Sequence, residues 1–249
     1  MTDIKERPIL MSAEMVRATL DDRKSVTRRV IKLPRWATGW DDFEIGSNGE
    51  PLVICRDTGC LAEVPCPYGI PGHRLYVRES WCAADLFYGR DLETPAVIAY
   101  LADRTAINFD SDPPRPVGRI DIASWNWSLV KGRPSIHMPR WASRINLEIT
   151  EIRVERLTSI TAADVVAEGV RYPVTKDRRP LIDMGSKYAP IIYLPDRPAD
   201  HPNEFPSWTH EELLIAHFAY LWDSINGKRP GCSWADNCYV WVVSFRRIA

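Results

Sequence analysis

Glu168 lies where electrostatics alone would not place an acid. Thr161 can cap a helix in which Asp164 is the third residue, and Gly169 is typical of the position just past a helix end. The pattern predicts a helix over 161–169 with Glu168 in its last turn. A helix C-terminus carries partial negative charge, so a carboxylate is disfavoured there. Glu168 is therefore a candidate for chemistry.

Lys24 and Thr27 place an amine and a hydroxyl three residues apart. An isolated Lys-x-x-Thr is usually a surface feature. The β-branched run 26–31 predicts a strand in which Thr27 and Arg29 share one face. A regular strand would send Lys24 and Thr27 to opposite faces, so they converge only if Lys24 lies in a turn before the strand. The pair Asp21-Asp22 is typical of such a break.

The cysteines are a second possible source of chemistry. Cys55, Cys60 and Cys66 lie in one stretch, with His73 and Cys82 nearby. Their spacing is looser than that of the CxxC pairs that bind zinc. We expect reduced thiols, no metal and no other cofactor, with a structural metal at this cluster as the alternative.

The elements that would position these residues lack a regular βαβ rhythm. The patterns predict helices over 12–20, 161–169 and 209–227 and strands over 26–31, 74–79, 146–157 and 239–245. This order favours an α+β barrel over a Rossmann sheet. The last helix is expected to bury Leu213, Leu214, Phe218, Leu221 and Ile225.

Proline- and glycine-rich stretches interrupt this order. We expect one domain over 1–249, with insertions at about 33–71, 84–133 and 171–206. The net charge of −1 gives no overall basic field for holding long nucleic acid, so a small polar ligand fits better than duplex DNA. No apolar run approaches the roughly 20 residues of a membrane span, and 1–7 are charged. We expect a cytoplasmic protein without a membrane partner.

Four segments, in order, resemble the motifs of one family. Leu20–Arg29 resembles the G-R-K-T-x-T-x-R opening of ASCH domains. Gly72–Arg78 resembles their GDxLxVR strand, with His73 in place of the usual Asp. Ile160–Gly169 is similar to their helix ending in EG, and Val243–Phe245 to their last strand.

The resemblance implies a PUA-like mixed β-barrel with flanking helices and large loop insertions. Similar family members are small bacterial N4-acetylcytidine amidohydrolases, which need no metal. Their catalytic Lys, Thr and Glu fall on Lys24, Thr27 and Glu168. The present chain is more than twice as long, and its block 133–144 is associated with longer ASCH-like proteins that phages often encode. The implied ligand is a small modified cytosine nucleoside, with single-stranded RNA as a further candidate partner.

Two arrangements of these residues fit cleavage of an N4-acyl amide. Thr27 can attack with Lys24 as its base, which requires burial to lower the pKa of the lysine. A nearby Glu168 would oppose this by favouring the charged amine. Alternatively, Glu168 activates a water while Lys24 and Thr27 donate hydrogen bonds to the oxyanion.

Further residues are candidates for binding the substrate. Arg29 shares the face of Thr27, while two others follow a predicted core strand and the rest belong to the block 133–144. Structural ion pairs and core packing are the competing explanations. The candidates are Arg29, Glu79, Trp81, His137, Arg140, Trp141 and Arg144. Two other functions stay open: a noncatalytic PUA-like reader of modified RNA or DNA bases, and an ASCH-type ribonuclease.

Overall fold

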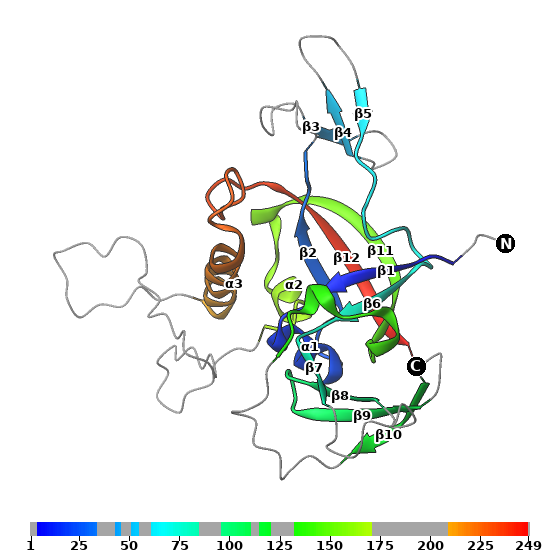
Figure 1. Ribbon diagram of the computed structural model, residues 1–249. Coiled ribbons are helices and arrows are strands. Elements are labelled where there is room, and N and C mark those ends of the chain that lie inside the picture. The colour runs from blue at the N-terminus through cyan, green and yellow to red at the C-terminus, as the bar shows by residue number, and fades with distance from the viewer. Residues whose placement is uncertain are drawn as a thin grey trace, which may run out of the picture. The chain divides into compact units, whose positions relative to one another are not determined.

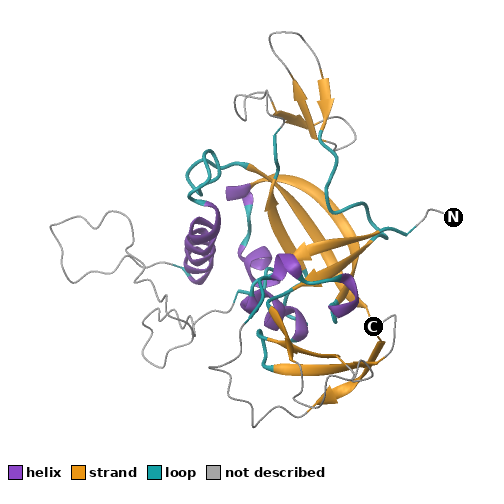
Figure 2. Cartoon of the chain, viewed as in Figure 1, coloured by secondary structure: helices purple, strands orange, loops and turns teal. Residues whose placement is uncertain are grey.

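The protein has an α+β fold, as the sequence predicts, but no closed barrel is present among the described residues. The computed structural model describes residues 4–33, 43–45, 51–54, 61–84, 96–110, 115–120, 132–170 and 209–248. Within these residues, strands predominate over helices (Figures 1 and 2). The helices are α1 (Ala13–Leu20), α2 (Ala162–Ala167) and α3 (His210–Asn226), with 3-10 turns η3 (Ser135–His137), η4 (Arg140–Ala142) and η5 (Leu157–Ser159).

The strands form three sheets. They are β1 (Glu6–Leu10), β2 (Val26–Val30), β3 (Phe43–Ile45), β4 (Pro51–Ile54), β5 (Leu61–Glu63), β6 (Arg74–Arg78), β7 (Trp81–Ala84), β8 (Ala96–Tyr100), β9 (Thr105–Asp110), β10 (Arg115–Ile120), β11 (Asn146–Arg156) and β12 (Tyr239–Ile248). The sheet orders are β1-β6-β11-β12-β2, β10-β9-β8-β7 and β3-β4-β5. In the first, β1 is parallel to β6 and β11 is antiparallel to it, so the sheet is mixed. Its outer strands among the described residues are β1 and β2.

The chain divides into two compact units. The first comprises Met1–Ser25, Pro65–Ile152 and Val243–Ala249, and the second comprises Val26–Val64 and Arg153–Val242. The expected single domain with three insertions stays a prediction. Much of 33–71 and 84–133, and all of 171–206, lie outside the described residues.

In the first unit, helix α1 begins at its N-cap Ser12, whose hydroxyl accepts a hydrogen bond from the Met15 backbone N–H at 3.3 Å. Strands β7 to β10 are antiparallel neighbours in chain order. Both faces of β8 are buried, and the Tyr100 hydroxyl donates to the Ala142 carbonyl at 2.8 Å. This core cluster contains Trp81, Ile98, Tyr100, Phe109, Met138 and Ala142.

In the second unit, α2 and α3 contact each other over an apolar cluster. Leu214, Phe218 and Trp222 recur every four residues and form the buried stripe of α3. Ile225, which the sequence suggests is buried, is 51% exposed because the stripe continues through Trp222 instead. The cluster also includes Val26, Leu157, Ile160, Val165, Cys238, Val240 and Val242.

Helix α3 is the longest helix in the described part of the chain. It has 17 residues and begins with a capping box between Thr209 and Glu212, at the start of the helix predicted over 209–227. None of the helices described is long and apolar enough to cross a membrane.

Candidate functional site

Lys24 lies in the segment between α1 and β2. Asp22 adopts a left-handed φ of 55°, which turns the chain after the helix. The backbone N–H groups of Arg23 and Lys24 then donate to the Ala18 carbonyl at 2.9 and 3.0 Å. The Lys24 residue is only 3% exposed, which is rare for a lysine. The predicted turn before the strand is therefore present, and it holds a buried amine.

Strand β2 buries two polar residues in succession. Thr27 is 1% exposed and Arg28 is 4% exposed. Strand alternation puts Arg28 on the same face as Val26, which belongs to the apolar cluster of the second unit. A charge buried among apolar side chains requires partners, since leaving it unpaired is costly.

Glu168 is one of those partners. Helix α2 forms as predicted, with a reciprocal capping box between Thr161 and Asp164 and a positive φ of 87° at Gly169. Glu168 is the C-cap residue and is 8% exposed. Its Oε1 accepts a hydrogen bond from the Arg28 backbone N–H at 2.6 Å, and Arg28 Nη1 lies 3.9 Å from the same oxygen. The guanidinium offsets the unfavourable charge of the helix end.

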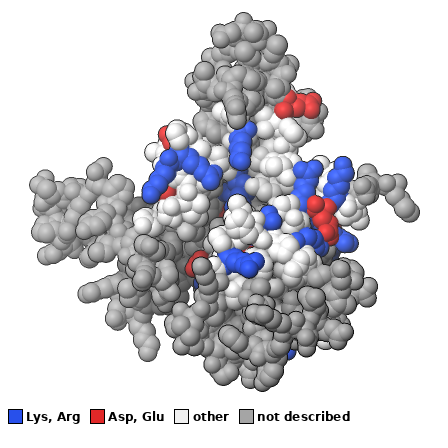
Figure 3. Space-filling view, in the orientation of Figure 1, with Lys and Arg blue, Asp and Glu red and all other residues white. Residues whose placement is uncertain are grey.

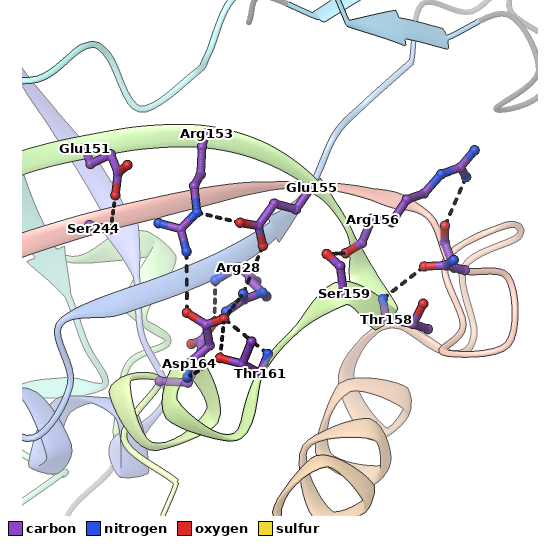
Figure 4. Close-up of polar contacts among 12 residues, drawn as sticks. Arg28, Glu151, Arg153, Glu155, Arg156, Thr158, Ser159, Thr161, Asp164 and Ser244 are labelled. Carbon is purple, nitrogen blue, oxygen red and sulfur yellow. Dashed lines mark hydrogen bonds and ion pairs between the residues drawn. The ribbon is translucent and has the colours of Figure 1, made fainter. Parts of the chain in front are cut away.

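Arg28 has further partners. We call Arg28, Arg153, Glu155, Asp164 and Glu168 the Arg28 cluster. Figure 4 labels Arg28, Arg153, Glu155 and Asp164. Arg28 Nη2 lies 3.1 Å from a carboxylate oxygen of Glu155 and 3.1 Å from one of Asp164. Arg153 contacts the same two acids, at 2.5 and 3.4 Å. Among the described residues, Arg28 Nε and Nη1 are buried and make no hydrogen bond.

Asp164 is held as an anion in this cluster. Partial burial alone would raise the pKa of its carboxyl. Hydrogen bonds from the backbone and hydroxyl of Thr161, together with the charge of Arg28, outweigh burial and hold the pKa below its ordinary value. The sequence identified Asp164 as a capping residue but gave no sign of its contact with Arg28.

A second cluster in the first unit joins two of the predicted binding residues. Arg144 Nε and Nη2 donate to the two oxygens of Glu79, both at 2.9 Å. The same guanidinium donates to Asp103 at 2.8 and 3.0 Å and to the Thr105 hydroxyl at 2.7 Å. It also lies 4.0 Å from the centre of the Tyr100 ring. The five N–H groups of Arg144 are all used within the protein.

Three other predicted binding residues lie at or near the surface. Arg140 pairs with Glu6 at 2.8 Å, and both side chains are more than a third exposed. Trp141 is 37% exposed and meets the Phe109 ring edge-on, with centroids 5.3 Å apart. His137 is exposed in η3. Trp141 and His137 thus remain open to solvent, whereas Arg140 is engaged in an ion pair.

Trp81 and Arg29 are less accessible. Trp81 is 4% exposed and belongs to the apolar core of the first unit, with Arg133 5.2 Å above its ring. Arg29 lies half-buried in β2. Trp81 is therefore a core residue of this structure. Core packing is the explanation that competes with substrate binding for this side chain.

The cysteines described by the structure are free thiols. Cys82 and Cys238 are buried, and Cys66 and Cys232 are partly buried. Burial raises the pKa of the Cys66 and Cys82 thiols. The other two residues of the predicted cluster, 55 and 60, lie outside the described residues. Within the described ranges, no three His, Cys, Asp or Glu side chains form a group suited to a metal ion.

Surface charge is mixed on the face drawn in Figure 3. Lys and Arg appear there in several separate groups, and Asp or Glu lie beside some of them. The net charge of −1 over the whole chain gives no support to a strong, sequence-independent hold on nucleic acid.

The three predicted catalytic residues do not all belong to the same compact unit. Thr27 and Glu168 belong to the second unit, where Glu168 binds the residue that follows Thr27. Lys24 belongs to the first unit and precedes Thr27 by three residues of chain. All three side chains are buried.

Comparisons with known proteins do not assign the chain to a family. No protein-family model matches it, and no curated protein or solved structure is significantly similar to it.

Proposed function

We propose that this protein is an amidohydrolase that removes the acyl group from N4-acylcytosine nucleosides, yielding cytidine and a carboxylate. The observation that carries the proposal is burial. The polar or charged residues that are buried in the described part of the chain are Thr19, Lys24, Thr27, Arg28, Glu79, Glu168 and Asn226. Three of these seven are the residues onto which the catalytic Lys, Thr and Glu of the similar amidohydrolases fall. Buried polar side chains are few in any protein and need a structural or functional reason.

The proposal includes a PUA-like fold of the ASCH type. The four segments that carry the resemblance include β2, β6, α2 and part of β12. The three strands belong to the same five-stranded mixed sheet. An accidental likeness of short segments would have no reason to select three strands of one sheet and the helix that carries Glu168.

Two chemical routes remain within this proposal. In the first, the Thr27 hydroxyl attacks the acyl carbon while Lys24 accepts its proton and passes it to N4, so that the C–N bond breaks and cytidine leaves an acyl-threonine. Water then hydrolyses this ester to the carboxylate and restores Thr27. In the second, Glu168 accepts a proton from an attacking water while Lys24 and Thr27 donate to the oxyanion, and the proton passes to N4 as the C–N bond breaks. The carboxylate of Glu168, bound by a backbone N–H, is arranged as an acceptor, which favours the second route.

The primary test is hydrolysis of N4-acetylcytidine, followed by loss of its ultraviolet band. A series of larger N4-acyl groups extends the assay to bulkier substrates. We expect turnover by the wild type and none by Lys24→Ala. The matched control is Lys32→Ala, because Lys32 is exposed just beyond the same strand. Absence of turnover across the acyl series would refute the proposal. Salt-sensitive binding of an oligonucleotide without hydrolysis would favour the base-reader alternative.

The role of Thr27 has a separate test. Intact-mass measurement during stalled turnover is expected to detect an acyl adduct on Thr27 if this hydroxyl is the nucleophile. Thr27→Ser keeps a hydroxyl and serves as the matched variant for Thr27→Ala. If Thr27→Ala retains most of the wild-type kcat, the first route is wrong and the water route stands.

A further inference from the structure

Cys232 and Cys238 lie at the two ends of a short segment in the second unit. Five residues separate them, between the end of α3 and the start of β12 (Figure 1). Both are free thiols; Cys238 is 0% exposed and Cys232 is partly exposed. Neither belongs to the proposed catalytic residues, so the chemistry of this pair is independent of the proposed hydrolysis.

The segment between the two cysteines folds back on itself. The Asp236 backbone N–H donates to the Ser233 carbonyl at 3.2 Å, which closes one turn. The Asn237 backbone N–H donates to the Trp234 carbonyl at 3.1 Å and closes the next. Asn237 also adopts a left-handed φ of 46°, which reverses the chain as at the end of a helix. The segment therefore brings its two ends together.

Both cysteines are also fixed from outside the segment. The Cys232 carbonyl accepts a hydrogen bond from the indole N–H of Trp222 at 2.8 Å. The Cys238 carbonyl accepts one from the Leu157 backbone N–H at 2.9 Å. Trp222 and Leu157 belong to the same apolar cluster as Cys238. The two ends of the segment are thus anchored on one core.

The two thiols act on each other. Burial raises the pKa of Cys232, and a hydrogen bond from the Cys238 thiol opposes this rise. Burial raises the pKa of Cys238 to about 12, and the charge of a Cys232 thiolate adds to the rise. Such mutual effects require side chains that lie close together. Because neither thiolate is stabilised, ionisation does not favour the reduced pair, and a disulfide between the two would resist reduction.

We propose that Cys232 and Cys238 are a redox modification site, at which exchange with a small disulfide such as oxidised glutathione forms a reversible bond that ties the end of α3 to the start of β12. The more exposed Cys232 attacks one sulfur of oxidised glutathione, and one glutathione leaves with the Cys232 proton. Cys238 then attacks the Cys232 sulfur of the mixed disulfide, and the second glutathione leaves with the Cys238 proton. Two protein thiols are oxidised while one glutathione disulfide is reduced to two thiols.

Peptide mapping tests the site. The reduced full-length protein is incubated with oxidised glutathione at mildly alkaline pH, where more thiolate forms. Remaining thiols are then blocked with iodoacetamide before digestion with trypsin. Both cysteines lie in one tryptic peptide, 229–246. We expect this peptide to carry no alkyl group and to lack two hydrogens, and to accept two alkyl groups after dithiothreitol treatment. Two alkyl groups without dithiothreitol, or glutathione retained on Cys232, would overturn the proposal.

Alanine variants separate the roles of the two thiols. In Cys238→Ala, Cys232 should stop at the mixed disulfide with one glutathione. In Cys232→Ala, the buried Cys238 should remain a thiol. Cys66→Ala is the matched control, because Cys66 is partly buried like Cys232 but lies in the first unit. Its peptide 229–246 should form the disulfide as in wild type. Glutathione on Cys238 in the Cys232→Ala variant would contradict the assigned order of attack.

Thermal unfolding tests whether the bond ties the two elements together. The oxidised wild type should unfold at a Tm about 5 °C above that of the reduced protein, because closing a loop restricts the unfolded chain. Cys232→Ala treated in the same way should show no rise. This comparison does not need Cys238→Ala, so it holds even if that variant folds poorly. An equal Tm for oxidised and reduced wild type, with the disulfide present, would refute the constraint on α3 and β12.

Discussion

Arg28, which is buried, and Arg144, whose side chain is 9% exposed, lie in different compact units and have opposite patterns of hydrogen bonding. Arg144 donates all five of its N–H groups to Glu79, Asp103 and Thr105, and its planar group lies against an aromatic ring. Among the described residues, Arg28 Nε and Nη1 have no hydrogen bond. Its contact with Glu168 Oε1 through Nη1 is 3.9 Å long.

The difference separates two uses of a buried charge. The Arg144 network, consisting of Arg144, Glu79, Asp103 and Thr105, is closed, because every donor has an acceptor and every acid shares the same cation. Such a network fixes structure and leaves nothing for a ligand. In the Arg28 cluster, Nε and Nη1 of Arg28 make no hydrogen bond among the described residues. Incompletely satisfied buried groups are expected where a protein works rather than where it is only held together.

The largest expected effect is the loss of folding stability when the closed network around Arg144 is broken. Arg144→Met leaves Glu79, which is 1% exposed, without its cation. We expect a loss of about 3–5 kcal/mol in the free energy of unfolding, since breaking a buried pair strands a charge. Urea unfolding monitored by tryptophan fluorescence measures it. The control Arg246→Met removes an exposed pair with Glu148 and should cost about 0–1 kcal/mol. Equal losses would show that the closed network does not stabilise the first unit.

Arg28→Met should cost less stability than Arg144→Met. The side chains of Glu155 and Asp164 are 25% and 20% exposed, so water can reach them when the guanidinium is gone. Arg153 also continues to contact both acids. Methionine suits the apolar face that Arg28 shares with Val26. We expect a loss of about 2 kcal/mol, measured by the same urea unfolding. A loss as large as that of Arg144→Met would mean that the two clusters do not differ in kind.

Acid titration compares the two clusters in another way. Burial would raise the pKa of Asp103, but hydrogen bonds from Arg144 and its positive charge outweigh burial and lower it. For Asp164, hydrogen bonds from Thr161 and the charge of Arg28 have the same effect. Both folded pKa values lie below the ordinary 3.8. The stability from each acid is therefore present above pH 3.8 and is lost as the pH falls through its folded pKa.

Asp103→Asn and Asp164→Asn should each make the free energy of unfolding less dependent on pH below 3.8. Urea unfolding at several acidic pH values measures the slope. The expected change is smaller than the loss from Arg144→Met, because each variant removes one acid and leaves the cation another partner. Slopes equal to wild type in both variants would mean that these two acids do not drive acid unfolding.

The sequence predicted local structure well because its signals are local. The turn at Asp22, the capping box of α2 and the capping box of α3 each depend on residues within a few positions of one another. Ile225 was predicted wrongly because two stripes fit the same helical period, and only packing selects Trp222 over Ile225.

Contacts between distant segments were not predictable in this way. Strand β1 was missed, and its parallel pairing with β6 joins Glu6 to Arg74 across the whole of α1 and β2. The contact of Arg28 with Glu168 spans 140 residues, and that of Arg144 with Glu79 spans 65. One signal was present in the sequence: an arginine between Val26 and Val30 on the apolar face of a strand must find a buried acid.

The smallest effect concerns the N-cap at which α2 begins. Thr161 caps this helix and also donates its hydroxyl to Asp164 at 2.9 Å. Thr209 forms the equivalent capping box with Glu212 on α3. Thr161→Ala and Thr209→Ala should each cost about 1 kcal/mol, measured by urea unfolding. Only Thr161→Ala should also raise the pKa of Asp164, followed by carboxylate NMR, because hydrogen bonds from Thr161 help to hold that pKa below its ordinary value. If Thr209→Ala raises the pKa of Asp164 equally, the shift reports general loosening of the second unit and not the loss of the Thr161 cap.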